Sequence, residues 1–270
     1  QGLRCDQPET FRGIRAWRRL SNAELKNTVQ DIFGSVEGVD FNDFINDIPK
    51  KESFDTVSIS TNYVYGARFK GYMKFAESLS QKLDMKVIFP CLSEGSACVN
   101  RIVPQLATRA WRRPASEAEI SNLNAVHAAM ISDGLSPEEA ARSLLQAIVL
   151  SQNFLYRSEM GKMQADGIFL LTDWEIASAL SYALWRRPPD QTLLDAAAKG
   201  ELSKAEALRA QADRMFADPK ARLAWGEFAG MWLDNRKVLN ATKPQAEFTA
   251  DLKNKMASET ERFFVNTMFD

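Results

Sequence analysis

The 270-residue sequence has one histidine and three cysteines, and nowhere does it contain the Cys-x-x-Cys-His pattern that attaches a c-type haem covalently. Cys5 is followed by Asp-Gln-Pro, Cys91 by Leu-Ser-Glu and Cys98 by Val-Asn-Arg. We therefore expect no covalent haem in this chain. The single histidine, His127, is interpreted as a core-edge or surface residue, because zinc and di-iron sites need several ligands together.

Other catalytic signatures are also missing. The sequence has no glycine-rich phosphate loop and no Gly-x-Ser-x-Gly elbow that could work with His127 as a hydrolase. No run approaches the roughly 20 apolar residues that a membrane-spanning helix requires, so no transmembrane segment is predicted. Basic and acidic residues nearly cancel, at 34 and 35, and this balance predicts no binding to nucleic acid.

Two local groups of charge are interpreted as solvated. A basic excess near the start is expected to form a solvent-facing surface rather than a binding patch; it comprises Arg4, Arg12, Arg15, Arg18, Arg19 and Lys26. The acidic run Asp40, Asp43 and Asp47 superficially resembles a calcium loop. Phe44 stands where such a loop needs a ligand and the loop glycine is absent, so we expect a turn-rich solvated loop.

Cys91 and Cys98 enclose a short polar loop, and this spacing predicts a disulfide rather than two reduced thiols. Cys5 is then the remaining cysteine, and we expect it either to bond a partner segment or to stay free. Such cysteine usage favours an oxidising compartment. The sequence opens at Gln1 with no basic-then-apolar leader, and we expect that a leader was removed or the sequence trimmed.

Helix-start signals recur along the chain. Capping boxes begin at Ser21, Ser116 and Thr172, each with a glutamate three residues later, and Ser136 is followed by Pro137 at the first helical position. Helical periodicity continues over 69–83 and 99–111, where Pro104 predicts a kink or a helix start. Further helices are expected at about 190–199, 203–217, 219–235 and 249–268.

These patterns predict an all-α fold of about ten helices packed in two subdomains, residues 1–160 and 161–270. A long irregular connection over 35–65 has room for a short hairpin near 54–65, because 56–60 alternate like a strand. The polar segment 160–167 is interpreted as the hinge between the subdomains. Four tryptophans fall on helical stripes, which favours core packing over a carbohydrate platform; they are Trp174, Trp185, Trp225 and Trp232.

The tetrapeptide Trp-Arg-Arg-Pro occurs at 111–114 and again at 185–188. Each fits a helix end, because cations complement the helix dipole in the last turn and proline then stops the helix. The tryptophans are expected to pack inward while the arginine heads reach outward. The alternative is that Arg112, Arg113, Arg186 and Arg187 form two clusters that dock an acidic partner or haem propionates.

The last helix carries an apolar stripe made of Leu252, Met256, Thr260, Phe263, Phe264 and Met268. Left uncovered, it would expose more apolar surface than isolated monomers commonly tolerate. We therefore predict that Phe263, Phe264 and Met268 dock a further polypeptide. The alternative is that the helix folds back and buries the stripe within this chain.

Six ordered motifs resemble those of planctomycete-type cytochrome-c-associated proteins made of consecutive helical domains of unknown function. They lie at 18–34, 109–114, 154–159, 175–190, 214–219 and 259–264. Residues 109–114, Arg-Ala-Trp-Arg-Arg-Pro, are similar to the family's Arg-Ala-Phe-Arg-Arg-Pro. The sequence departs from the family at Leu25, where relatives have tyrosine, and it stops at Asp270, where relatives continue.

The resemblance implies an exported protein whose haem c lies outside this chain, in a C-terminal continuation or a separate subunit. It carries no redox residue onto this sequence. The leading hypothesis is a helical scaffold and docking region of a c-type-cytochrome electron-transfer protein. One alternative is part of a secreted haem-dependent oxidoreductase that acts on an extracellular substrate. The other is a non-redox protein–protein interaction module.

Overall fold

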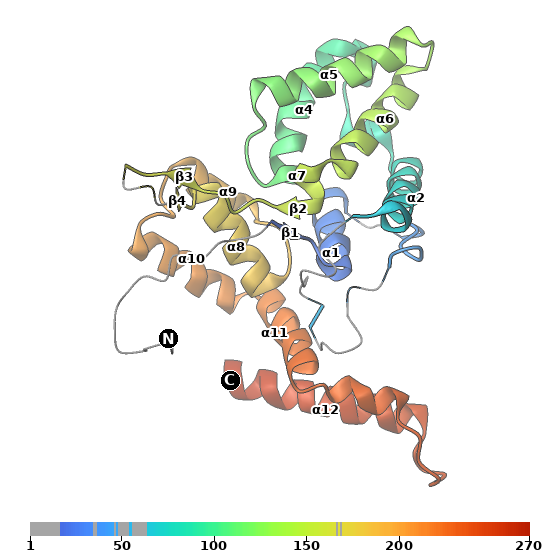
Figure 1. Ribbon diagram of the computed structural model, residues 1–270, viewed down its shortest axis with the longest axis vertical. Helices are drawn as coiled ribbons and strands as arrows, with labels where there is room; N and C mark the ends of the chain where they lie inside the picture. Colours follow the sequence, from blue (N-terminus) through green and yellow to red (C-terminus); the bar gives the residue numbers. More distant parts are fainter. Residues whose placement is uncertain are drawn as a thin grey trace.

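A computed structural model of the chain describes residues 17–34, 37–45, 47, 54–55, 64–165, 167 and 169–270 (Figure 1). The fold is all-α, as predicted. Its helices of eight or more residues are α1 (Asn22–Phe33), α2 (Gly66–Lys82), α4 (Ser96–Trp111), α5 (Glu117–Ser132), α6 (Pro137–Leu150), α8 (Asp173–Trp185), α9 (Gln191–Ala198), α10 (Ala205–Ala217), α11 (Pro219–Trp232) and α12 (Ala250–Phe269). Shorter ones are α3 (Met85–Ile88), η1 (Leu92–Glu94), α7 (Gln152–Leu155) and η2 (Asn235–Asn240).

The helix starts follow the sequence closely. Reciprocal capping boxes form at Ser21, Ser116, Ser136 and Thr172, where each side chain accepts the amide of the glutamate three residues on. Each box satisfies two backbone N–H groups that the first turn otherwise leaves unpaired. Pro104 does not begin a helix, because α4 runs through it from Ser96.

A large apolar core lies among α1, α2, α4, α5 and α6 in the upper half of Figure 1. Its fully buried members include Phe75, Val103, Leu144 and Phe154. A smaller core lies among α8, α9, α10 and α11 and is centred on Trp185, with Leu193 and Met215 against it. Tyr182 of α8 belongs to the larger core, so this helix connects the two.

Two small sheets join segments that sequence patterns do not pair. β1 (Arg18–Arg19) runs antiparallel to β2 (Tyr156–Arg157), and this pairing ties the first described residues to the end of α7. The segment interpreted as a polar hinge contains β3 (Lys162–Met163), which pairs with β4 (Phe169–Leu170). The predicted strand 56–60 and Cys5 lie outside the described residues.

The two interpretations of solvated charge are wrong for Arg19 and Asp47. Both are buried and ion-paired, and Arg68 of α2 pairs with the same Asp47 carboxylate at 3.1 Å. The Arg19 guanidinium also donates to the Tyr72 hydroxyl at 2.8 Å. A buried carboxylate between two arginines is tolerated because every charge has a partner. The network joins Asp47 to β1 and α2.

The predicted disulfide is present. Cys91 and Cys98 are joined, with their Cα atoms 5.3 Å apart, across the turn that leads from η1 into α4. Cys98 is fully buried in the larger core. The link therefore fastens an exposed loop to the start of a core helix. None of the helices in the described residues is long and apolar enough to cross a bilayer.

Residues 219–269, comprising α11, η2 and α12, are called here the C-terminal arm. Figure 1 shows the arm extending away from the helices that form the larger core. Its own packing is aromatic: Phe228 stacks on Trp232 at 5.9 Å between ring centroids, and Phe264 meets Trp232 edge-on at 6.3 Å. In α12, Ala257 is the single buried residue, whereas the shorter α6 buries six.

Candidate functional site

Both Trp-Arg-Arg-Pro motifs form the same turn between two helices. Trp111 and Trp185 are buried at the ends of α4 and α8, and their indole N–H groups donate to the carbonyls of Ile148 and Met215. The next residue in each is a left-handed helix cap, with φ of 60° at Arg112 and 54° at Arg186. The next helix begins six residues after each tryptophan, capped by Ser116 or Asp190.

The expected outward direction of the arginine heads is wrong for the first arginine of each motif. Arg112 is 3% exposed, and its Nη2 donates to the backbone carbonyls of Asn153, Phe154 and Tyr156. Arg112 follows the last turn of α4 in the left-handed conformation, and its guanidinium reaches the carbonyls of the segment that follows α6. Burial lowers the pKa of the Arg112 guanidinium. Arg112 is not available to bind an acidic partner.

Arg186 is also buried, but its partners are acidic. It pairs with Asp55 and lies 2.9 Å from the Glu227 carboxylate at Nε. The second arginines are part-exposed and paired: Arg113 with Glu119 at 2.7 Å, and Arg187 with Asp31. In each motif the first arginine is therefore buried and the second is paired with a carboxylate, so the two do not form an exposed cluster.

Behind Arg112 lies a buried cluster that joins the two cores. The guanidinium groups of Arg112 and Arg157 both lie over the Tyr182 ring, 5.8 Å and 5.0 Å from its centroid. The Tyr182 hydroxyl is 2.7 Å from that of Thr28 in α1, and burial raises the pKa of this phenol. Glu24, buried in the first turn of α1, is the nearby carboxylate that interacts with both Arg112 and Tyr182.

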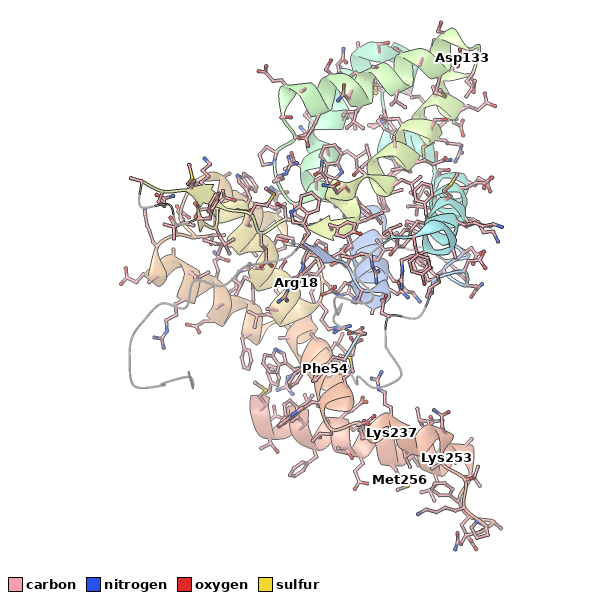
Figure 2. The ribbon with its side chains drawn as sticks, in the orientation of Figure 1. Arg18, Phe54, Asp133, Lys237, Lys253 and Met256 are labelled. Atoms are coloured by element: carbon pink, nitrogen blue, oxygen red, sulfur yellow. A yellow bond between two sulfur atoms is a disulfide. The ribbon has the colours of Figure 1, made fainter. Side chains whose placement is uncertain are left out.

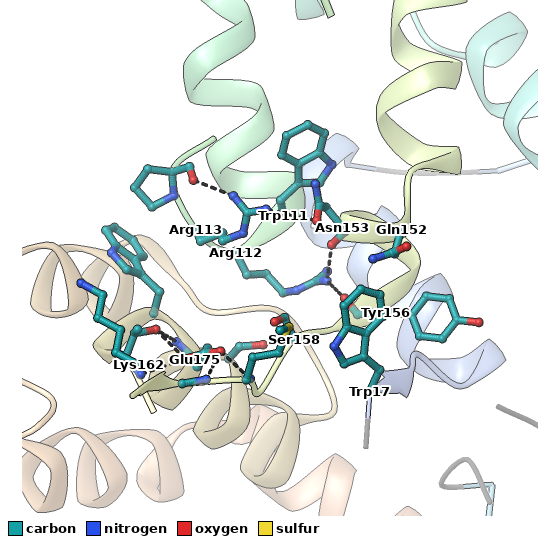
Figure 3. A pocket seen from close by; sticks show the side chains of 16 residues that line it. Trp17, Trp111, Arg112, Arg113, Gln152, Asn153, Tyr156, Ser158, Lys162 and Glu175 are labelled. Atoms are coloured by element: carbon teal, nitrogen blue, oxygen red, sulfur yellow. Dashed lines mark hydrogen bonds between the residues drawn. The ribbon is translucent and has the colours of Figure 1, made fainter. Parts of the chain in front are cut away.

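In front of Arg112, a cleft of about 560 Å³ opens between the helices of the larger core and those of the smaller core (Figure 3). Its lining comes from both sides: the residue before β1, the first Trp-Arg-Arg-Pro turn, α7, the segment up to β3, and the start of α8. Figure 3 shows Trp111 and Arg113 on one side, Lys162 and Glu175 on another, and Trp17 beside Tyr156 on a third.

One wall of the cleft is a fixed polar network. Arg113 donates to both oxygens of Glu119 and to the Asn153 side-chain oxygen, and the Asn153 amide donates to Glu119. Hydrogen bonds from Arg113, together with the Ser116 amide, lower the pKa of Glu119 to about 2. The opposite wall holds Glu175, which accepts the backbone amides of Met160 and Gly161 as well as capping α8.

The remaining polar groups of the cleft are less engaged. Ser178, 5% exposed, has a buried hydroxyl with no hydrogen-bond partner in the described part of the chain. The side chains of Gln152 and Lys162 are exposed, and neither forms an ion pair or side-chain hydrogen bond within the described ranges. Gln152 and Lys162 are free to meet a ligand, and the unpaired Ser178 hydroxyl is buried at the edge of the cleft.

The apolar stripe of α12 divides in the structure. Phe263 is 74% exposed and Met268 39% exposed, whereas Phe264 turns toward α11 and is half-buried. Leu252 and Met256 share the outer side with Phe263. Figure 2 shows these arm side chains, with Met256 and Lys253 labelled on α12. The stripe is not buried by folding back within the described part of the chain.

His127 is buried in α5, and burial lowers the pKa of its imidazole. Among the described residues no group of three or more His, Cys, Asp or Glu side chains is arranged to hold a metal ion. The core interpretation of the tryptophans holds for Trp185, which is 2% exposed. It is wrong for Trp232, which is 57% exposed, and Trp174 both packs on the smaller core and lines the cleft.

The cleft itself was not predicted. Its lining residues outside the arginine motif carry no catalytic signature, and they come from separate parts of the chain; the unpredicted ones are Trp17, Gln152, Asn153, Tyr156, Lys162 and Ser178. The one usable signal was the set of ordered motifs. Those at 109–114, 154–159 and 175–190 all reach the cleft.

Three consecutive matches to families of planctomycete-type domains cover most of the chain. Residues 18–84 match PSD3, a protein of unknown function (DUF1587); residues 98–159 match PSD5, a protein of unknown function (DUF1595); and residues 171–270 match PSD4, a protein of unknown function (DUF1592). No curated protein and no solved structure matches the chain. The consecutive domains implied by the ordered motifs are thereby confirmed.

Proposed function

We propose that this chain, built from three consecutive planctomycete-type domains of unknown function, is the helical scaffold and docking region of an exported c-type-cytochrome electron-transfer protein. The haem would lie in another polypeptide segment, which the C-terminal arm would hold. The observation that carries this proposal is the uncovered apolar surface of the arm.

That surface is formed by large side chains on all three elements of the arm. Leu223 and Trp232 of α11 are 65% and 57% exposed, and Phe263 of α12 is 74% exposed; Leu233, Leu239, Leu252, Met256 and Met268 add to them. Soluble monomers rarely leave contiguous apolar patches larger than a few hundred Å² in water. Aromatic residues and methionine are also the types enriched at protein interfaces.

Export is supported by the disulfide. Cys91 and Cys98 form a disulfide, and such links persist mainly where the surroundings are oxidising, as outside the cytoplasm. The buried arginines do not contribute to docking, so within the two motifs a role at a haem-bearing partner falls to Arg113 and Arg187. These two are part-exposed and already paired, and they would act at the rim of an interface rather than at its centre.

The test is a photo-crosslinking amino acid placed at Phe263 of the full-length protein in its native host. The expected product is an adduct that retains covalent haem on a denaturing gel. Ile131 is the matched control position: it is 40% exposed on α5, which Figure 1 shows at the opposite end of the molecule from α12. A crosslinker there should give no such adduct.

Two results would count against the proposal. An adduct at Phe263 without haem would favour the plain interaction module, and the absence of any specific adduct would remove the docking role. The cleft favours a second candidate, part of a secreted haem-dependent oxidoreductase, because an enzyme of that kind needs a substrate site. Substrate-dependent consumption of an electron acceptor by the haem-bearing complex would select it.

A further inference from the structure

The cleft in front of Arg112 contains both broad apolar rings and unengaged hydrogen-bonding groups. We propose that it binds a short segment of a neutral glycan, with pyranose rings against Trp17, Tyr156 and Trp174 and hydroxyl groups at Gln152, Lys162 and Ser178. This site is separate from the arm, and the inference stands whether or not the arm docks a haem-bearing partner.

The aromatic residues give the cleft the faces that a sugar ring needs. Trp17 is 37% exposed and lies with its ring centroid 6.2 Å from that of Tyr156, at an angle of 54°. Trp174 stands at the start of α8 with one side packed against the smaller core. A pyranose has C–H groups on its faces and hydroxyls around its edge, so it can cover indole surface without burying polar atoms.

The hydroxyl of Ser178 is the most specific indication of a polar ligand. Ser178 lines the cleft, and its buried hydroxyl has no hydrogen-bond partner in the described part of the chain. Leaving such a group unpaired costs about 1–3 kcal/mol, so its presence at a cleft is explained by a partner that arrives with the ligand. A ligand hydroxyl can both donate to it and accept from it.

The charges of the cleft favour a neutral ligand over a phosphate. The guanidinium of Arg112 is occupied by backbone carbonyls, Arg113 is neutralised by Glu119, and Glu175 is engaged by backbone amides. Of the charged groups lining the described cleft, Lys162 alone is without such a partner. A phosphate site would instead present several convergent cationic or amide donors.

The size of the cleft agrees with part of a chain rather than a whole polymer. A volume of about 560 Å³ falls within the roughly 300–1,000 Å³ usual for small-ligand sites. Its walls are contributed by helices of both regions, and such boundaries are common locations for ligand sites. A glycan bound there would contact both regions at once.

The experiment is calorimetric titration of the full chain with soluble hexasaccharides of β-1,4-linked glucose, xylose, mannose and N-acetylglucosamine, and with inorganic phosphate. At least one hexasaccharide should bind, and phosphate should not. Trp17→Ala should weaken binding by about tenfold or more, because it removes one stacking face. Trp232→Ala is the matched control, since that indole is exposed on the arm, away from the cleft.

Ser178→Ala separates binding from folding. Removing an unpaired buried hydroxyl should leave the thermal midpoint unchanged or raised, while binding weakens several-fold. The proposal is overturned if none of the four hexasaccharides binds, if phosphate binds in their place, or if Trp17→Ala and Ser178→Ala both bind like the parent chain. It is equally overturned if Trp232→Ala weakens binding as much as Trp17→Ala does.

Discussion

The two Trp-Arg-Arg-Pro turns are the same sequence in two different surroundings. In both, a buried tryptophan donates to a backbone carbonyl and the next arginine adopts a left-handed cap. The partners of that arginine differ: Arg112 donates to backbone carbonyls, whereas Arg186 pairs with the carboxylates of Asp55 and Glu227. Local sequence therefore produces the turn, and the surrounding structure chooses the partners.

The largest expected effect tests what the two turns share. Trp111→Ala and Trp185→Ala should each lower the free energy of unfolding by about 3–5 kcal/mol, because both remove a buried indole. Urea denaturation followed by circular dichroism measures both. A cost below about 1 kcal/mol for either would mean that the two tryptophans do not play equivalent roles.

The next effect tests how the two turns differ. Arg112→Met and Arg186→Met should each cost about 3 kcal/mol, since one leaves buried carbonyls without a donor and the other leaves Asp55 without its cation.

A double-mutant cycle with Asp55→Asn separates the two arginines. Asp55→Asn should couple to Arg186→Met by about 1.5–3 kcal/mol and add to Arg112→Met within about 0.5 kcal/mol. Equal coupling to both arginines would contradict the assigned partners.

The caps that follow the two turns should show a smaller contrast. Ser116→Ala removes only the N-cap of α5 and should cost about 1 kcal/mol. Asp190→Ala removes the N-cap of α9 together with an ion pair to Arg214 at 2.8 Å, and it should cost more. Thermal unfolding of the two variants under one buffer condition compares them. Equal costs for the two variants would mean that the Asp190–Arg214 pair contributes nothing.

The smallest expected effect is a pH dependence of stability that comes from Glu119, the partner of Arg113 in the first Trp-Arg-Arg-Pro turn. Glu119 has a pKa of about 2 in the folded chain, below the value of 4.5 expected without its partners. Its contribution is therefore fully present above about pH 4.5 and is lost as the pH falls toward 2. The pair is part-exposed, so the change should be on the order of 1 kcal/mol.

Glu119→Gln is the corresponding variant, and urea midpoints measured between pH 2 and pH 6 provide the comparison. This variant should lose part of the acid-dependent decrease in stability that the parent chain shows. An identical pH profile in parent and variant would mean that the Arg113–Glu119 pair does not stabilise the fold.

Much of the fold was predictable because its signals are local. The capping boxes, the stop after α9 and the Cys91–Cys98 link each depend on residues close together in the chain. The β1–β2 pair and the Asp47 network were not predictable, because they join residues far apart in sequence. The cleft was not predictable for the same reason, because its walls come from segments that only folding brings together.

The sequence by itself determined where α1, α5, α6 and α8 begin, through side chains that satisfy backbone groups of the first turn. It also determined the two left-handed turns, because the same tetrapeptide occurs at both places and a helix begins six residues after its tryptophan in each. Only the tertiary structure decided that Arg112 and Arg186 turn inward, that two guanidinium groups lie over the Tyr182 ring, and that Phe263 stays in water. The physical reason is that burial and charge pairing depend on neighbours supplied by distant segments, and a local pattern does not specify them.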